Sequence, residues 1–300
     1  MKNWQREMEN NLHESVLVSE VVEALHIEKN GRYIDATVGN AGHTLEILKM
    51  GGEVLGIEVD PKMLAIADER LKKSGEKNYK LVNGNFTGID KIAEENGFNP
   101  VDGILFDLGV TNLHLKDLER GFSFANEETV LDMRLNPEAQ GVKAADLLNI
   151  LREDQLEGLF KVTLDPGAAK WLTGRVLHSR TVKPIETVGD MLEISKGLKI
   201  GKSNLNEATL PFLALRIAVN SELTNLEEVL PKAFKILTKG GRLVVISFHS
   251  GEDAVVKNFF KEKSKEEGRV ITIKPVMAGQ EELEVNRRAR SAKMRILEKL

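Results

Sequence analysis

The stretch "GRYIDATVGNAGHTLEILKMGGEVLGIEVD", residues 31–60, decides the fold class. Residues 32–36 have the pattern of a strand, and residues 43–50 have the pattern of a helix that two glycines close. Residues 53–60 then form a second strand pattern. A strand, a helix and a strand in this order predict a right-handed crossover between parallel strands.

The alternation continues beyond this stretch. Helical patterns begin at Pro61 and cover residues 89–97, and strand patterns occupy residues 79–84 and 101–107. Pro61 is well placed at a helix start, because a helix does not need the N–H that proline lacks there. Strands separated by helices predict an α/β fold with a mostly parallel sheet.

The pattern changes over residues 115–205, where helical periodicity and scattered turn residues leave no convincing strand. A helix or helix pair then extends from residue 206 to about residue 236, and a further helix is expected near residues 252–264. Strand patterns return at residues 242–248, 269–274 and 292–300. We therefore expect an all-helical domain of residues 115–205, inserted into a discontinuous core of residues 1–114 and 206–300.

The composition is that of a soluble globular protein, with 41% hydrophobic and 29% charged residues among 300. The net charge of −4 does not by itself indicate a nucleic-acid partner. The absence of cysteine excludes a disulfide framework, a cysteine-type zinc site and a thiol nucleophile, and we expect no metal. Without a signal-peptide pattern or an apolar run of about 20 residues, the sequence predicts a cytoplasmic protein with no membrane partner.

A glycine-containing loop, "DATVGNAGH", joins the first strand to its helix. Glycine lets backbone amides approach a ligand, and the start of a helix favours negative charge. The spacing Gly39-Asn40-Ala41-Gly42 is not G-x-G-x-x-G, which disfavours a nicotinamide dehydrogenase. A loop of this kind is about as common without any ligand.

Three further strand ends carry residues that suit a nucleoside. Glu58 ends the second strand and is placed to accept hydrogen bonds from ribose hydroxyls, as in dinucleotide-binding folds. The alternative is a solvated carboxylate; Asp60 looks like the cap of the next helix, which leaves Glu58 for the ligand. Phe86 follows the third strand and can flank an adenine, and Asp107 ends the fourth. Together they predict an adenosine-type site.

The sequence resembles the bacterial 16S ribosomal RNA cytosine-N4 methyltransferases, the MraW/RsmH family, along nearly its whole length. The motifs that carry the resemblance are "HESVLVSEVVEAL" (13–25), "YIDATVGNAGHT" (33–44), "VDGILFDLGV" (101–110), "RGFSF" (120–124), "LDMR" (131–134), "LALRIAVNSEL" (213–223), "GGRLVVISFHSGED" (240–253) and "NRRARSAKMR" (286–295).

The resemblance implies a Rossmann-like, S-adenosylmethionine-dependent methyltransferase core with a seven-stranded sheet and an inserted helical substrate-recognition domain. By position, it puts Glu58 on the ribose of the cofactor and Phe86 beside the adenine. The full set of expected cofactor-binding residues is Asp35, Gly39, Asn40, Ala41, Gly42, His43, Glu58, Phe86, Asp107 and His114. Two departures stand out: "GNAGH" has less glycine than usual, and His114 replaces a glutamine.

The implied reaction is methylation of the exocyclic N4 amine of a cytidine in 16S ribosomal RNA of the small subunit. This amine is a poor nucleophile, because its lone pair is delocalised into the ring. A hydrogen-bond acceptor near its protons favours a more nucleophilic nitrogen, and Asp107 is our first catalytic candidate; the alternative is a purely structural turn. His249 is the second candidate, although a strand-end histidine paired with the backbone is nearly as common. His13 is a weaker one.

Local charge predicts where RNA binds. Two segments lack acidic residues, and their predicted phosphate-binding side chains are Lys170, Arg175, Arg180 and Lys183 in the first and Arg287, Arg288 and Arg290 in the second. The rival interpretations are a methyltransferase with another nucleic-acid or small-molecule target, and a catalytically weak or silent RNA-binding factor of ribosome assembly on the same fold. A homodimer is left open.

Overall fold

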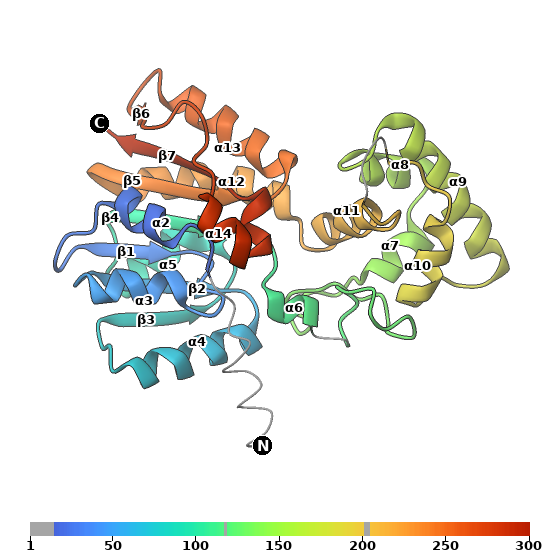
Figure 1. Ribbon diagram of the computed structural model, residues 1–300, viewed down its shortest axis with the longest axis horizontal. Coiled ribbons are helices and arrows are strands. Elements are labelled where there is room, and N and C mark those ends of the chain that lie inside the picture. Colours follow the sequence, from blue (N-terminus) through green and yellow to red (C-terminus); the bar gives the residue numbers. More distant parts are fainter. Residues whose placement is uncertain (1–14, 117–118, 201–204) are drawn as a thin grey trace. The chain divides into compact units, whose positions relative to one another are not determined.

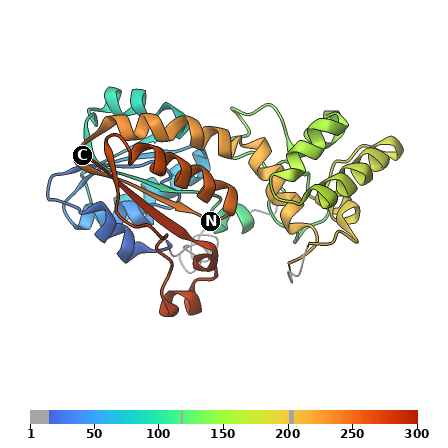
Figure 2. The same ribbon diagram turned by 90° about the horizontal axis from the view of Figure 1, so that it is seen from above.

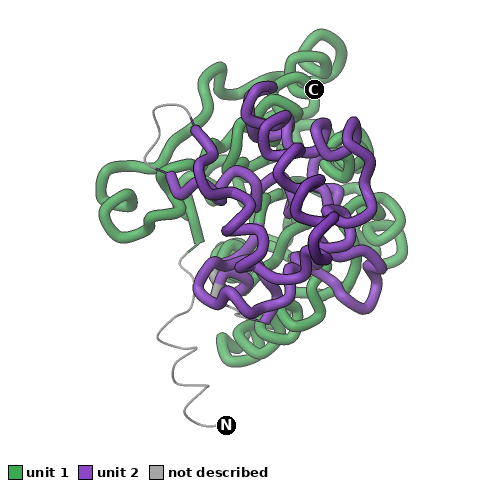
Figure 3. The backbone as a smooth tube through the Cα atoms, turned by 90° about the vertical axis from the view of Figure 1, so that its right-hand side faces the viewer, with its two compact units in different colours: residues 1–109, 224–300 green, residues 110–223 purple. Residues whose placement is uncertain are grey.

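The computed structural model describes residues 15–116, 119–200 and 205–300. The chain divides into two compact units (Figure 3). The first comprises the residues up to Gly109 together with Thr224–Leu300, and the second comprises Val110–Leu223. Within the described residues, no helix combines the length and apolar character that crossing a membrane requires.

The first unit is built on one seven-stranded sheet (Figure 1). Its strands are β1 Arg32–Asp35, β2 Glu53–Glu58, β3 Tyr79–Asn83, β4 Val101–Asp107, β5 Leu237–Ser247, β6 Gly268–Val270 and β7 Lys293–Lys299. They lie in the order β3-β2-β1-β4-β5-β7-β6. The pairs from β3 to β5 are parallel, and β7 is antiparallel to both of its neighbours. The mostly parallel, seven-stranded sheet is thus confirmed.

Helices cover both faces of this sheet, as Figure 2 shows. One layer contains α2 Val18–Leu25, α3 Gly42–Lys49 and α4 Pro61–Ser74. The other contains α5 Ile89–Asn96, α12 Glu222–Ile236 and α13 Ser250–Lys263. Successive strand residues point to opposite faces, so Leu105 packs in the first layer and Ile104 and Phe106 pack in the second. The sheet is therefore buried on both faces, as its continuous apolar runs predict.

The expected start of α4 is confirmed. The Asp60 side chain caps the helix by accepting a hydrogen bond from the Lys62 backbone N–H at 2.9 Å, and Pro61 occupies the first turn. Gly75, with a φ of 81°, ends the helix. This local chemistry fixes where the chain leaves β2, and hence the position of Glu58.

Two predicted strands differ in extent. β5 begins at Leu237 rather than residue 242, because Leu237 pairs with Val101 and a register shift follows. β6 ends at Val270 rather than residue 274. It is an edge strand, and beyond it Ile273 is 92% exposed, so the apolar run there is not buried in the sheet.

The second unit is helical. Its helices are α6 Asn112–Lys116, α7 Ala144–Ile150, α8 Glu153–Lys161, α9 Pro166–Val182, α10 Val188–Ser195 and α11 Thr209–Val219. Leu148, Phe160, Leu172, Met191 and Leu215 meet in one apolar core. The helices supply most of this core.

The division differs from the expected insertion of residues 115–205 at both ends, because the second unit begins at Val110 and extends to Leu223. Phe212 and Leu215 of α11 pack in the core of the second unit, whereas Leu226 of α12 packs in the core of the first. Between the two helices Ser221 adopts a positive φ of 51°, which ends the helical path. The boundary between the units depends on which core the apolar face of each helix packs into. Helical periodicity predicts the apolar face but not the core that it contacts.

Candidate functional site

The carboxyl ends of β1 and β4 lie side by side where the strand order reverses, the point at which open α/β sheets bind ligands. Asp107 is the last residue of β4, and His43 lies in the first turn of α3. The Nε2 atom of His43 is 3.6 Å from Oδ2 of Asp107. A residue at the start of a helix and a strand-end residue, 64 positions apart in the chain, thus form one polar pair.

This pair has unused hydrogen-bonding capacity. Among the described residues, neither ring nitrogen of His43 nor Oδ1 of Asp107 has a hydrogen-bond partner, although these atoms are buried. Each unpaired buried polar group costs about 1–3 kcal/mol, so such groups are rare without a purpose. Three of them at one point indicate a site for a polar ligand.

The charge state of His43 follows from its neighbours. Burial lowers the pKa of the imidazole, but the adjacent Asp107 carboxylate, and then Asp35, raise it by more, so the net pKa shift is upward.

Asp35 holds the loop that carries His43. Its Oδ1 accepts a hydrogen bond from the Thr37 N–H at 3.2 Å, and its Oδ2 accepts one from the Thr44 hydroxyl at 2.6 Å. The Thr37 hydroxyl in turn accepts a hydrogen bond from the Asp107 N–H at 2.6 Å. Burial raises the pKa of Asp35, which is 1% exposed. Asp35 thus holds the loop in position through hydrogen bonds to Thr37 and Thr44. These two threonines are residues of the candidate site that the sequence interpretation missed.

The loop backbone is compact where a ligand can approach. Gly39 and Ala41 have φ values of 53° and 62°, in the left-handed region. A Cβ on Gly42 would stand 1.9 Å from the Ser15 hydroxyl oxygen, so any larger residue there would displace the Ser15 side chain. Asn40 is buried, and its carbonyl accepts a hydrogen bond from Arg70.

Glu58 is 8% exposed at the end of β2. Its Oε2 accepts the Gly39 N–H and its Oε1 accepts the Asp60 N–H, both at 2.9 Å. Asp60 caps α4 as expected. The expectation that Glu58 is therefore free for a ligand is wrong, because both of its carboxylate oxygens already accept backbone hydrogen bonds. Each oxygen keeps a second lone pair for a ligand. Burial raises the pKa of Glu58 to about 7, and the two backbone hydrogen bonds oppose that rise.

Phe86 starts a short 3-10 helix, η1 Phe86–Gly88, directly after the loop that follows β3. Its half-buried ring packs edge-on against Phe106, with 5.6 Å between the ring centroids. The ring is therefore fixed at the strand ends with part of its surface open to contact.

The three candidate histidines outside the loop differ in their surroundings. The Nδ1 atom of His249 caps α13 by accepting the N–H groups of Gly251 and Glu252, at 3.2 and 3.4 Å. This is a helix cap, not the backbone-carbonyl pairing considered as the alternative. His114 belongs to the second unit, where it is buried and its ring lies 5.6 Å from that of Phe122. His13 lies outside the described residues.

The basic residues of α9 are less available than their sequence suggests. Lys170 is exposed, and the Arg175 guanidinium lies over the Trp171 ring at 5.3 Å. Arg180 donates to two carbonyls at the end of α7, which gives it a structural role. Lys183 pairs with Asp190 of α10 at 2.6 Å. The segment itself has no acidic residue, but the fold places the carboxylate of Asp190 next to Lys183.

The carboxyl-terminal basic residues lie in η2 Arg287–Ser291 and β7, after α14 Gln280–Val285. Arg287 and Arg290 are exposed. The Arg288 guanidinium lies over the Phe248 ring, 4.8 Å from its centroid. Arg295, by contrast, is buried and pairs with Asp253 at 2.7 Å. Exposure thus separates the arginines of this motif.

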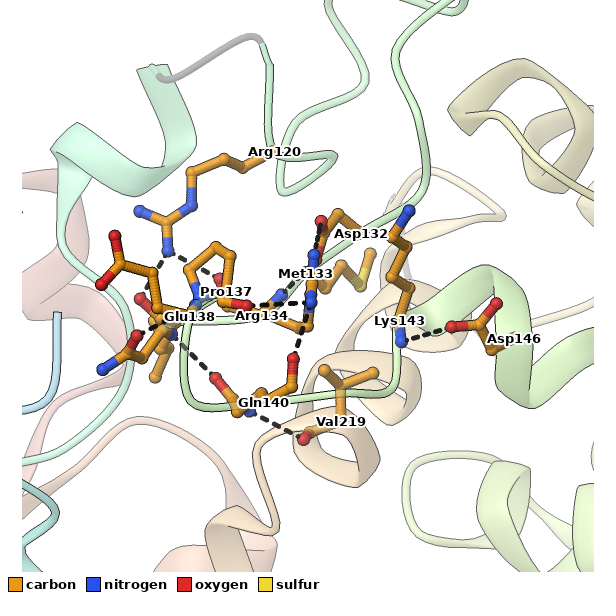
Figure 4. Close-up of polar contacts among 12 residues, drawn as sticks. Arg120, Asp132, Met133, Arg134, Pro137, Glu138, Gln140, Lys143, Asp146 and Val219 are labelled. Carbon is orange, nitrogen blue, oxygen red and sulfur yellow. Dashed lines mark hydrogen bonds and ion pairs between the residues drawn. The ribbon is translucent and has the colours of Figure 1, made fainter.

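In the second unit, two motifs of the chain form one polar network (Figure 4). Arg120 donates to the carbonyls of Arg134 and Leu135 at 2.6 and 2.7 Å. The Arg134 guanidinium binds both oxygens of Asp132. Met133 between them has a φ of 63°, a conformation that this network holds in place. The motifs "RGFSF" and "LDMR" therefore stabilise one loop.

The fold and the site define a Rossmann-like methyltransferase core. The chain belongs to the MraW methylase family, whose model matches residues 10–300. It is similar to proteins named ribosomal RNA small subunit methyltransferase H. The relative from Clostridioides difficile (strain 630) is 36% identical over 96% of this chain and 99% of its own length. The relative from Methylacidiphilum infernorum (isolate V4) is 38% identical over 99% of this chain and 97% of its own length. The relative from Heliobacterium mobile is 37% identical over 96% of this chain and 99% of its own length.

Proposed function

We propose that this protein transfers a methyl group from S-adenosylmethionine to the N4 amine of a cytidine in 16S ribosomal RNA of the small subunit. Family membership and the names of the relatives support a small-subunit ribosomal RNA substrate. The observation that carries the proposal is the His43–Asp107 pair, with its buried unpaired polar atoms, at the sheet's switch point.

The residues at the strand ends fit the cofactor. Glu58 keeps lone pairs for the ribose hydroxyls, and Phe86 offers an open ring surface to the adenine. Ala41 to His43 are assigned to the methionine part, where the imidazole nitrogens need partners. When bound, S-adenosylmethionine supplies an electrophilic methyl group.

Asp107 is assigned to the target amine. Its buried, unpaired Oδ1 is suited to accept a hydrogen bond from the amine, which turns the nitrogen lone pair away from the ring. The same oxygen is placed to receive the proton that the amine loses after methylation. His43, 3.6 Å from Oδ2, and the Thr37 hydroxyl, which binds the Asp107 N–H, hold the carboxylate in position. Roles for His249 in catalysis and for His114 in cofactor binding stay predictions.

RNA contacts are assigned to the exposed or stacked cations of both basic segments: Lys170, Arg175, Arg287, Arg288 and Arg290. Arg180 donates to two carbonyls and Lys183 is ion-paired with Asp190, so both are expected to contribute less; Arg175 also donates to the Glu193 carbonyl, at 2.9 Å. The target base must leave its stack to reach a strand-end carboxylate.

The test is transfer of a tritiated methyl group to small ribosomal subunits from a strain that lacks this enzyme, followed by nucleoside analysis of the RNA. We expect labelled N4-methylcytidine. Asp107→Ala should abolish the label, whereas Asp68→Ala, which removes an ion-paired carboxylate from the surface of α4, should retain it. A different labelled nucleoside would change the target, and RNA binding with no transfer would identify the protein as an assembly factor.

A further inference from the structure

The stack of Arg288 on Phe248 links the basic segment η2 to the carboxyl end of β5, next to the strand that ends at Asp107. Phe248 follows β5 directly, and Arg288 lies in η2, 40 positions later. The guanidinium carbon is 4.8 Å from the ring centroid, well inside the range of a cation–π contact. Both side chains are half-buried, so the cation is fixed at the surface rather than extended into solvent.

The segment that carries Arg288 is anchored at several points. Val276 pairs with Met294 through two backbone hydrogen bonds, and Glu282 accepts the Leu17 N–H at 2.9 Å. Asn286 caps η2 by accepting the Arg288 N–H at 3.2 Å. Ala289, on the turn beside Arg288, is fully buried. The position of Arg288 is thus determined by backbone contacts as well as by the Phe248 ring.

Strand register places this stack near Asp107. Asp107 of β4 pairs with Ile246 of the neighbouring strand β5. Phe248 lies two residues beyond Ile246 in the chain, one residue past the end of β5. Adjacent strands are about 4.8 Å apart and each residue advances about 3.3 Å, which puts the two Cα atoms roughly 8 Å apart. A group of the substrate held at this stack is therefore a close neighbour of whatever Asp107 contacts.

The chemistry of a stacked guanidinium specifies the ligand. Arginine presents a planar set of N–H donors that matches a phosphate with two parallel hydrogen bonds, while its flat face rests on an aromatic ring. In RNA complexes, phosphate contacts of this kind fix the position of the nucleotide. Arg287 and Arg290 are exposed, and neither guanidinium lies over an aromatic ring of the residues that the structure describes.

We propose that Arg288, held by Phe248, binds the backbone phosphate next to the target cytidine and so positions its amine at Asp107. Arg288 is thus a substrate-positioning residue, and Phe248 orients Arg288. Arg287 and Arg290 supply general attraction to RNA. This inference rests on the proposed methylation of small-subunit RNA.

The experiment compares kcat and KM for small subunits across Arg288→Ala, Arg288→Lys, Phe248→Leu and Arg290→Ala. Arg269→Ala is the matched control, because Arg269 is an exposed arginine of the edge strand β6, paired with Glu298. Melting curves verify that each variant is folded. Binding of the RNA substrate by filter retention, at several salt concentrations, is the readout that does not depend on catalysis.

We expect Arg288→Ala to lower kcat on the order of tenfold to a hundredfold, because misplaced reactants lose most of their rate. Arg288→Lys should keep the salt dependence of RNA binding but lose kcat similarly, since lysine cannot form the planar contact. Phe248→Leu should lie between. Arg290→Ala should raise KM alone and reduce the salt slope by about one.

The proposal is overturned if Arg288→Ala keeps the kcat of Arg269→Ala, or if Arg288→Lys is as active as the wild type. Failure of the proposed function gives a different result: the wild type itself transfers no label. In that case filter retention tests the phosphate contact. Weaker RNA binding by Arg288→Ala than by Arg269→Ala supports the contact, and equal RNA binding by the two variants overturns it.

Discussion

Glu58 should make the stability of this protein depend on pH in an unusual direction for a carboxylate. Burial raises its pKa from 4.5 to about 7 in the folded protein. Between these two values the folded protein holds a proton that the unfolded chain has released, so the free energy of unfolding falls as pH rises. Below about pH 4.5 the Glu58 contribution is fully present, and above about pH 7 it is lost.

The magnitude follows from the same two pKa values. One pKa unit corresponds to about 1.4 kcal/mol, so the rise from 4.5 to about 7 amounts to about 3 kcal/mol across this window. Asp35 and His43, whose pKa values are also raised, change stability in the same direction. Glu58 is therefore isolated by comparing the wild type with Glu58→Gln.

The assay is urea unfolding of both proteins between about pH 5 and pH 8. Glutamine cannot ionise, so Glu58→Gln should be less stable at low pH, where it loses one backbone hydrogen bond, and should gain on the wild type as pH rises. Glu53→Gln, at the opposite end of β2, is the matched control. Parallel pH profiles for wild type and Glu58→Gln would refute the assignment of this titration to Glu58.

Three further predictions concern the site and its supports. Asp107→Ala should lower the methylation rate about a hundredfold or more in the tritium-transfer assay, in the range expected for a group that handles a proton; an unchanged rate together with unchanged cofactor affinity by calorimetry would contradict its role. Thr44→Val should cost about 1–3 kcal/mol in urea unfolding, because it leaves one buried oxygen of Asp35 without its 2.6 Å hydrogen bond, and Thr44→Ser should restore it. Arg180→Ala should destabilise the protein by about 1–3 kcal/mol, since two carbonyls at the end of α7 lose a charged donor, whereas Lys170→Ala should keep stability and weaken RNA binding at low salt; equal effects of the two variants on both measurements would refute this division.

Local patterns were sufficient for β1 to β4 and for α3 to α5 of the first unit, but they did not predict α2 or α14. The Asp60-Pro61 cap and the apolar period of α4 act over a few residues, and the structure reproduces them. The predicted strand at 269–274 was wrong at its carboxyl end. β6 pairs with β7 only to Val270, although β7 itself continues to Lys293, opposite the residues that follow Val270. An apolar run therefore does not reveal where an edge segment leaves the sheet.

The candidate site shows the same division. Strand-end positions pointed to Glu58 and Asp107, since parallel strands bring their carboxyl ends to one edge. That Glu58 binds two backbone N–H groups, and that Thr37 links the loop to Asp107, depends on contacts between segments far apart in the chain. No periodicity encodes such contacts.

The sequence by itself determined the α/β class and the seven strands of the core, and it predicted a helical insertion and a site at the strand ends, because these follow from short-range periodicity, caps and motif order. The tertiary structure decided which charges are available. It gave Arg180 and Lys183 partners within the protein, buried Arg295 against Asp253, and fixed Arg288 on Phe248. The physical reason is that the state of a charged side chain depends on what packing brings within a few ångströms of it, and those neighbours come from other elements of the fold.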